Sequence, residues 1–232
     1  LRRQRQMCIR DRLIRFGSSG LAGVWAEENT REAIYEAFKR KETFGTSGPR
    51  IKLRFFAGYS FEDSNLVDTN LIKKAYAQNT TMGGTIQSEK SIEPKFLIWA
   101  ISDPEGAPLQ RVQVIKGWLE DGVHREKIFD VACSDGKIVN PETNRCPDNK
   151  AEVNLEDCSF SLEDGDVELK TFWKDPEFRR DQNAFYYSRA LENPTCRWST
   201  WDAIRENETP RSDIPLTIQE RAWSSPIWFQ GN

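Results

Sequence analysis

The stretch that decides the fold is GVWAEENTREAIYEAFKRK, residues 23–41, which contains one amphipathic helix. Asn29 is a favourable N-cap, and Glu32 follows where a capping-box carboxylate returns a hydrogen bond to the cap amide. Acidic residues crowd the first turn and basic residues the last, which complements the helix dipole. The expected buried face consists of Ala33, Ile34, Ala37 and Phe38. We therefore expect a helix over residues 29–41.

A β-rich region follows this helix. Gly45, Gly48 and Pro49 end the helix, and residues 51–55 then alternate apolar and basic side chains as a half-buried strand does. Short helices are expected after Asp68, over 71–76, and after Ser199, over 201–205. Further strands are expected at 95–101, 109–118, 125–131, 167–173, 184–191 and 221–229. The sequence thus predicts a mainly β, antiparallel, β-sandwich-like domain with few helices.

Two turns organise the middle of the predicted domain. Asp103-Pro104-Glu105-Gly106 closes the strand at 95–101, and Asp121-Gly122 is a strong hairpin signal. Three consecutive strands with tight turns favour an antiparallel meander. Residues 133–165 are rich in Gly, Pro, Asn, Asp and Cys, so we expect a disulfide-stapled loop there.

Four motifs carry a family resemblance: WAEENTRE at 25–32, TSGPR at 46–50, RVQVIKGW at 111–118 and IQERAWSSPIW at 218–228. They resemble the C-terminal third of a bacterial family known as domain of unknown function 3604, over about residues 20–229. Complete members resemble PHP-type metal-dependent hydrolases with an α/β barrel. The resemblance implies that residues 13–50 are the C-terminal remnant of that barrel. Residues 51–232 would then form an accessory β-sandwich.

The first twelve residues are set aside from the fold. QRQMCIRDR, residues 4–12, resembles a translated sequencing adapter, and the alternative is a basic arm for nucleic acid. Residues 1–12 contribute five positive charges and one negative, so the net charge of the remaining chain is −7 instead of −3. An acidic body of this kind does not favour nucleic-acid binding. No apolar run approaches the roughly 20 residues of a membrane span.

The cysteines give the clearest chemical signal. Of five cysteines, four remain without Cys8, namely Cys133, Cys146, Cys158 and Cys196. An even number in Pro- and Asp-rich loops favours two disulfides and a periplasmic or secreted protein. Three pairings are open, of which we take Cys133–Cys146 with Cys158–Cys196 as the leading one. A zinc site and free thiols are the alternatives, although the paired close spacing of zinc ligands is missing.

Catalytic groups are scarce in this sequence. PHP-type catalysis needs several His and carboxylate ligands to hold divalent metals, and the only histidine is His124, beside the predicted hairpin turn. Glu27 and Glu28 could reach an active-site edge, but helix-dipole complementarity explains them as well. Oxygen-bearing side chains that could bind Ca²⁺ are Asp135, Asn140, Glu142, Asn144 and Asp148, without the spacing of a known calcium loop. We expect no catalytic, cofactor or metal site in this chain.

Aromatic residues provide a binding alternative. Trp198 and Trp201 flank a predicted helix start, and a row that could stack on sugar rings contains Trp223, Trp228, Tyr186 and Tyr187. Core packing is the commoner use of such side chains. Two functions stay open. The chain is either an inactive fragment of a metal-dependent, phosphoesterase-like hydrolase whose missing N-terminal barrel is its partner, or a binding or structural β-sandwich, for example one that binds carbohydrate.

Overall fold

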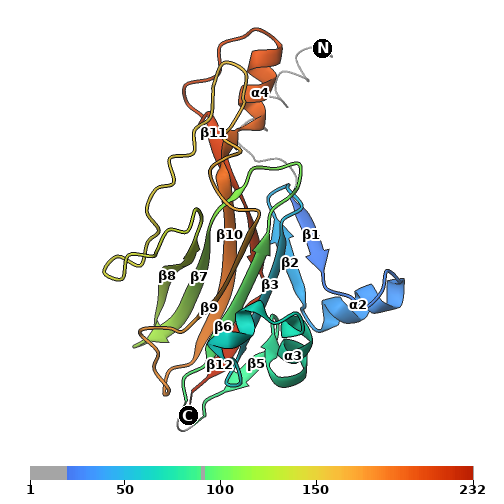
Figure 1. Ribbon diagram of the computed structural model, residues 1–232, viewed down its shortest axis with the longest axis vertical. Helices are drawn as coiled ribbons and strands as arrows, with labels where there is room; N and C mark the ends of the chain where they lie inside the picture. The colour runs from blue at the N-terminus through green and yellow to red at the C-terminus, as the bar shows by residue number, and fades with distance from the viewer. Residues whose placement is uncertain (1–19, 90–91, 232) are drawn as a thin grey trace.

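Two β-sheets stacked face to face dominate the computed structural model, which describes residues 20–89 and 92–231 (Figure 1). The mainly β, antiparallel fold expected from the sequence is confirmed. The eight-stranded sheet comprises β1 (Leu21–Val24), β2 (Thr43–Thr46), β5 (Thr85–Gln87), β7 (Leu109–Glu120), β8 (Val123–Cys133), β10 (Ala184–Cys196), β11 (Thr217–Ser224) and β12 (Ile227–Gln230). The four-stranded sheet comprises β3 (Lys52–Gly58), β4 (Thr80–Thr81), β6 (Lys95–Ile101) and β9 (Glu168–Trp173).

Strand β10 is the centre of the larger sheet. One edge pairs with β7, and the other pairs with β11 and β12 in succession. Outward from there, β8 extends the sheet beyond β7, and β2 and β1 extend it beyond β11. All these pairings are antiparallel, whereas β12 pairs with β5 in parallel. Residues 21–46 therefore contribute two strands to the same sheet as residues 109–133.

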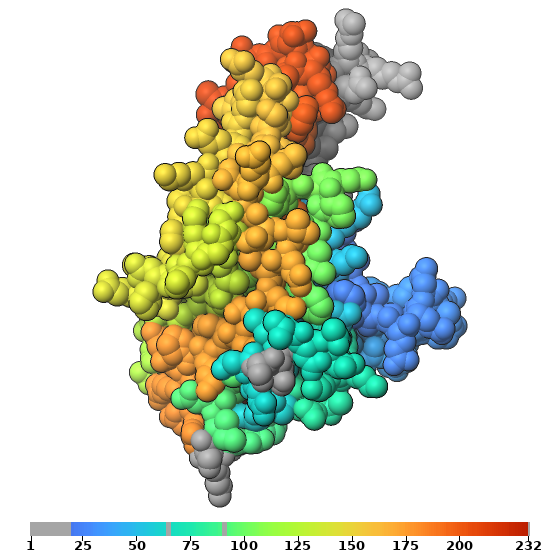
Figure 2. All heavy atoms as spheres, viewed as in Figure 1, coloured from blue at the N-terminus to red at the C-terminus, as the bar shows by residue number. Residues whose placement is uncertain are grey.

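Helices cover only parts of the sandwich. The short η1 (Asp63–Val67) and α3 (Leu71–Gln78) lie over the outer face of the smaller sheet, where Leu71 and Ala75 pack on Phe56 and Leu97. Helix α4 (Trp198–Arg205) lies at one end of the molecule, and α2 (Arg31–Lys39) projects from its side (Figures 1 and 2). None of the described helices has the length and apolarity needed to cross a membrane.

The core lies between the two sheets. Strands alternate inward and outward side chains, so β10 sends Tyr186 and Ala190 inward while their neighbours face outward. The ring of Phe96 packs against that of Tyr186 with centroids 4.7 Å apart. The main cluster also includes Leu53, Phe55, Ile98, Leu109, Val112, Val114, Phe129, Ile227 and Phe229.

A buried ion pair joins the two sheets. Lys116 of β7 donates to Asp175, which follows β9, with Nζ and Oδ2 2.6 Å apart and both side chains almost fully buried. The Tyr186 hydroxyl donates to the same carboxylate oxygen at 2.8 Å, and burial together with Asp175 raises the pKa of this phenol. Lys116 also donates to the carbonyl of Glu177 at 2.9 Å. Removal of one partner would leave an uncompensated buried charge.

The hairpin prediction at Asp121-Gly122 is confirmed. Both residues have positive φ, 52° and 76°, as a type I′ turn requires, and they connect β7 directly to β8. The meander prediction is wrong, because β6 and β7 belong to different sheets. The turn at 103–106 carries the chain across the end of the sandwich, and turn residues give the same signal for a hairpin and a crossover.

The helix at the start of the chain differs in detail from the prediction. Its N-cap is Thr30 and not Asn29, because the Thr30 hydroxyl accepts from the Ala33 amide at 3.3 Å. On the predicted buried face only Ala37 is fully buried, and Phe38 is 50% exposed. Trp25, just before the helix, packs on the core and donates to the Leu53 carbonyl at 2.8 Å. The start of the helix is thus fixed to the core by Trp25, while one apolar side of the helix is exposed to solvent.

Three other boundaries also moved. Ser225 and Pro226 interrupt the predicted strand at 221–229 and divide it into β11 and β12. Helix α4 begins at Trp198 after Arg197, so Ser199 lies inside its first turn and is not the cap. Strand β10 continues beyond Leu191, through a bulge, to Cys196.

Both predicted disulfides are confirmed. Cys133–Cys146 has a Cα–Cα distance of 5.5 Å, and Cys158–Cys196 has one of 5.6 Å. The first attaches the loop to the end of β8, and the second attaches it to the end of β10. Cys8 lies outside the described residues, as does the whole predicted adapter segment, 1–12.

The two disulfides should differ in their contribution to stability. Their sequence separations are 13 and 38 residues, so chain-entropy arguments give about 3 kcal/mol for Cys133–Cys146 and about 4 kcal/mol for Cys158–Cys196. We expect the Cys158→Ser/Cys196→Ser double variant to lose more unfolding free energy in urea than the Cys133→Ser/Cys146→Ser variant. Thiol titration of denatured, unreduced protein should find only Cys8. More reactive thiols would contradict the presence of two disulfides.

Candidate functional site

An aromatic surface lies on the outer face of the eight-stranded sheet. Phe185 and Tyr187 of β10 stack with ring centroids 6.4 Å apart and an interplanar angle of 14°. Trp228 of β12 lies 5.4 Å from Phe185 and is 47% exposed. We call Phe185, Tyr187 and Trp228 the aromatic platform. Because side chains alternate along β10, the platform faces solvent while Tyr186 points into the core.

A glycine in the neighbouring strand leaves space for the Phe185 ring of the platform. Gly117 of β7 lies directly opposite Phe185. The Phe185 ring occupies the space above it, and a Cβ at Gly117 would lie 2.2 Å from the ring's Cζ. Any larger residue there would lift the ring away from the sheet. The position of the Phe185 ring therefore requires glycine at position 117.

A polar groove borders the platform. It has a volume of about 1160 Å³ and its walls come from β5, β7, β8, β10 and β12. Hydrogen-bonding side chains around it include Gln87, Glu120, His124, Arg125, Arg179, Asn183 and Gln230. Such a combination of apolar surface with a few polar groups is typical of small-molecule sites.

Three arginines occupy the same outer face, farther along the strands. Arg111 of β7 and Arg221 of β11 are both register partners of Leu191 in β10, and Arg189 lies two residues before Leu191. We call these three residues the arginine row. Arg189 donates to Gln113 Oε1 at 2.8 Å, and Arg221 donates to the Gln219 carbonyl at 3.0 Å. Burial, together with the charges of Arg221 and Arg111, lowers the pKa of Arg189.

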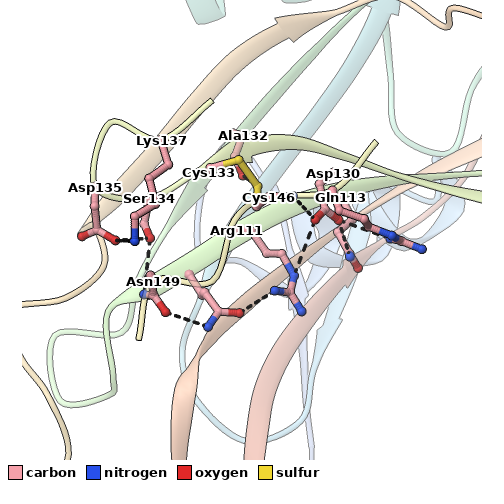
Figure 3. The surroundings of a disulfide bond; sticks show 12 residues. Arg111, Gln113, Asp130, Ala132, Cys133, Ser134, Asp135, Lys137, Cys146 and Asn149 are labelled. Carbon is pink, nitrogen blue, oxygen red and sulfur yellow. Dashed lines mark hydrogen bonds and ion pairs between the residues drawn. A yellow bond between two sulfur atoms is a disulfide. The ribbon is translucent and has the colours of Figure 1, made fainter. Parts of the chain in front are cut away.

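The loop excursion positions one end of this row (Figure 3). Asp130 of β8 accepts from Gln113 Nε2 at 2.6 Å and from the Cys146 amide at 2.7 Å, beside the first disulfide. Arg111 Nε lies 4.0 Å from the same carboxylate, and Arg111 Nη1 donates to Gln110 at 2.7 Å. Gln110 in turn donates to buried Asn149 of the loop. The disulfide and this network fix the side chains around Arg111.

The residues predicted at an active-site edge lie elsewhere. Glu27 and Glu28 are exposed in the connection before α2, and Glu28 accepts from the Thr30 hydroxyl at 3.1 Å. They are not brought to the aromatic platform or the arginine row. His124 is exposed in β8, just after the hairpin turn, and lines the polar groove.

The aromatic candidates divide between core and surface. Tyr186 is buried, whereas Tyr187 and Trp228 form the platform, and Trp223 is the register partner of Arg189. Trp198 and Trp201 lie in α4, away from this face. Sequence reasoning missed Phe185 and the arginine row. The alternation of side chains from Ala184 to Leu191 places Phe185 and Tyr187 on the same face of the strand. It does not indicate whether that face or the opposite one is buried.

Three of the side chains proposed for calcium accept hydrogen bonds from backbone amides. Asn140 Oδ1 accepts from the amides of Glu142 and Thr143, and Asp148 accepts from the Lys150 amide. Asp135 accepts from the Gly165 amide at 2.7 Å. Within residues 20–89 and 92–231, His, Cys, Asp and Glu form no group of three or more suited to a metal ion.

A second feature missed from the sequence is a buried carboxylate. Glu192, in the bulge of β10, is 1% exposed, and its Oε1 has no hydrogen-bond partner among the described residues. Burial, with Asp103 and Glu220 nearby, raises its pKa to about 8. Burial alone would raise the pKa of Asp103 as well, but the amides of Arg50 and Glu105 donate to this carboxylate and hold its pKa below the usual value. Glu192 is closed off from solvent and stands apart from the polar groove.

Together, fold and surface define a β-sandwich protein whose larger sheet presents an aromatic and arginine-bearing outer face. The chain belongs to the family described as "Protein of unknown function (DUF3604)", whose model matches residues 2–231. The match includes residues 2–12, which gives the adapter interpretation no support. Searches of curated proteins and of solved structures gave no match.

Glu192→Gln should reduce the pH dependence of stability. Because the folded-state pKa of Glu192 is about 8, above the ordinary 4.5, its stabilising contribution is complete below about pH 4.5 and is lost as pH rises through about 8. Glutamine avoids this loss, so the variant should gain on the order of a few kcal/mol relative to the parent protein at about pH 9 compared with about pH 5. Urea denaturation at the two pH values measures the unfolding free energy, and Glu208→Gln, at an exposed position, is the control. Parallel pH profiles would contradict the assignment.

Proposed function

We propose that this chain is a non-catalytic module that binds carbohydrate on the outer face of its eight-stranded sheet. The observation that carries the proposal is the aromatic platform beside a polar groove. A sugar ring has one apolar C–H face and a rim of hydroxyl groups. Phe185, Tyr187 and Trp228 offer the ring faces on which such an apolar surface stacks.

The groove complements the hydroxyl rim. Amide side chains such as Gln87 and Asn183 can both donate and accept, and the carboxylate of Glu120 accepts. His124 and Arg125 add donors on the β8 side. A few polar groups around an apolar floor would orient a ring without requiring a deep cavity.

Core packing accounts for some aromatic residues but not for the platform. Tyr186 and Phe229 fill the space between the sheets and are about 1% exposed. Trp228, next to Phe229 in β12, faces the opposite side of the sheet and is 47% exposed. A partly exposed aromatic surface next to a groove supports ligand binding.

A second proposal comes from the family resemblance. The complete protein would be a metal-dependent, phosphoesterase-like hydrolase acting on a small ester, and this chain would be its accessory sandwich next to a barrel. Glu27 and Glu28 would then lie at the edge of that barrel. The described residues do not fit the required divalent metal, because they contain no suitable ligand group. We therefore derive no catalytic step for this chain.

The two disulfides support a location in an oxidising compartment. Two disulfides in one chain are typical of oxidising environments. We propose that the protein is periplasmic or secreted, which would bring the aromatic face into contact with extracellular glycans.

Trp228→Ala should weaken carbohydrate binding. Loss of a stacked indole removes about 1.5–3 kcal/mol of apolar burial, equivalent to roughly a 10- to 150-fold increase in Kd. The measurement is affinity electrophoresis in gels containing neutral soluble polysaccharides, followed by calorimetry with oligosaccharides of any polymer that retards the protein. Tyr35→Ala, which removes an exposed ring from α2, is the matched control. Retardation that is equal for both variants, or absent from the parent protein, would contradict the proposal.

A further inference from the structure

We propose that the arginine row makes this face selective for acidic carbohydrates, whose carboxylate or sulfate group binds between Arg111, Arg189 and Arg221. This inference rests on the proposed function, since the aromatic platform supplies the sugar-stacking part of the same face. The row adds a charge requirement that the platform alone does not impose.

Strand register brings the three side chains together. Arg111 and Arg221 are the register partners of Leu191 in the two neighbouring strands. Arg111, Leu191 and Arg221 therefore form one line across the sheet. Arg189 lies two residues back along β10 and therefore on the same face. Arg221 and Arg111 are close enough to lower the pKa of Arg189. Three positive charges thus occupy one small area.

These charges are only partly compensated, because Glu126 acts on Arg189 from a distance without forming an ion pair with it. Within the described parts of the chain, no carboxylate lies within 4.0 Å of Arg189 or Arg221, whose bonds go to the neutral oxygens of Gln113 and Gln219. Arg111 has only Asp130, at 4.0 Å. That carboxylate already accepts from the side chain of Gln113 and the amide of Cys146.

An anion would complete this arrangement. All three arginines are half-buried, so their charges are partly removed from water. A planar guanidinium group presents paired donors that match the oxygens of a carboxylate or a sulfate. Bonds of this charge-assisted kind are roughly twice as strong as neutral ones. The bound oxygens would supply direct ion pairs, which Arg189 and Arg221 lack among the described residues.

The spacing sets the kind of ligand. Phe185 and Arg189 are four residues apart on β10, a span of about 13 Å at the rise of an extended strand. A single sugar ring cannot reach from one to the other, so the ligand is an oligosaccharide. Trp223, the register partner of Arg189, places a further aromatic residue beside the charged end.

One acidic residue gives the face a polarity. Burial, and then the charge of Glu126 in β8, raise the pKa of the Tyr187 phenol. The same charge acts on Arg189, but by strand register Glu126 lies in line with Gly117 and Phe185. It would repel an acidic group bound over the platform itself. The acidic substituent should therefore lie at the arginine end, with the stacked ring at the other.

The test compares matched acidic and neutral polymers at fixed ionic strength. One arm uses polygalacturonate against its methyl ester, and the other uses dextran sulfate against dextran, so that carboxylate and sulfate selectivity are separated. Affinity electrophoresis and calorimetry are applied to the parent protein, Arg189→Gln, Arg221→Gln and Arg189→Lys. Arg31→Gln on α2 removes an equal charge far from the row and is the control. Urea midpoints verify that each variant is folded.

We expect tighter binding of at least one acidic polymer than of its neutral counterpart. Each glutamine variant should lose about tenfold in that affinity, equivalent to about 1.4 kcal/mol, with neutral binding unchanged. Arg189→Lys, which keeps the charge and loses the paired donors, should lose less.

Neutral binding that persists without acidic preference would overturn this inference and leave the proposed function intact. Equal losses in Arg189→Gln and Arg31→Gln would indicate non-specific ion exchange and would also overturn it. Absence of binding to every polymer, acidic or neutral, would overturn the proposed function itself.

Discussion

The arrangement of the molecule depends on hydrogen bonding along both edges of strand β10. Its partners β7, β11 and β12 fix the strand in the middle of the larger sheet. Because side chains alternate, a slip of one residue would exchange core and surface. The bond from Tyr186 to Asp175, with Lys116 on the same carboxylate, opposes such a slip because it needs the phenol inside. The outward position of Phe185 and Arg189 follows from that constraint.

Polar interactions then connect the long loop to this frame. Asn149 joins Gln110 of β7 to Asn193 of β10 through its side chain, at 2.9 and 2.7 Å. Asn193 also donates to the Asp164 carbonyl at the far end of the loop. Buried groups of this kind are costly unless all their bonds are made. The loop therefore behaves as part of the sandwich, with the two disulfides reinforcing contacts that polar residues already specify.

Local patterns in the sequence predicted the longer strands, the hairpin at Asp121-Gly122 and both disulfides, because alternation, turn chemistry and cysteine spacing are local signals. The short strands β1, β2, β4 and β5 were missed. Long-range pairing was not accessible in this way. The end of β10 was missed because Glu192-Asn193-Pro194 resembles a turn, whereas tertiary contacts bury Glu192 and Asn193. The arginine row was missed for the same reason, since Arg111, Arg189 and Arg221 meet only through the register of three strands. The origin of residues 13–50 as a barrel remnant stays a prediction.

The contact between Gly117 and Phe185 links a residue without a side chain to the shape of the outer face. A Cβ at Gly117 would collide with the ring, so neither position can change freely while the other stays as it is. Among related chains the two positions should vary together, with glycine opposite a large aromatic ring and a bulkier residue opposite a small one. Loss of the glycine would leave the core intact and alter only the outer surface. Selection for glycine at this position should therefore depend on ligand binding and not on the stability of the fold.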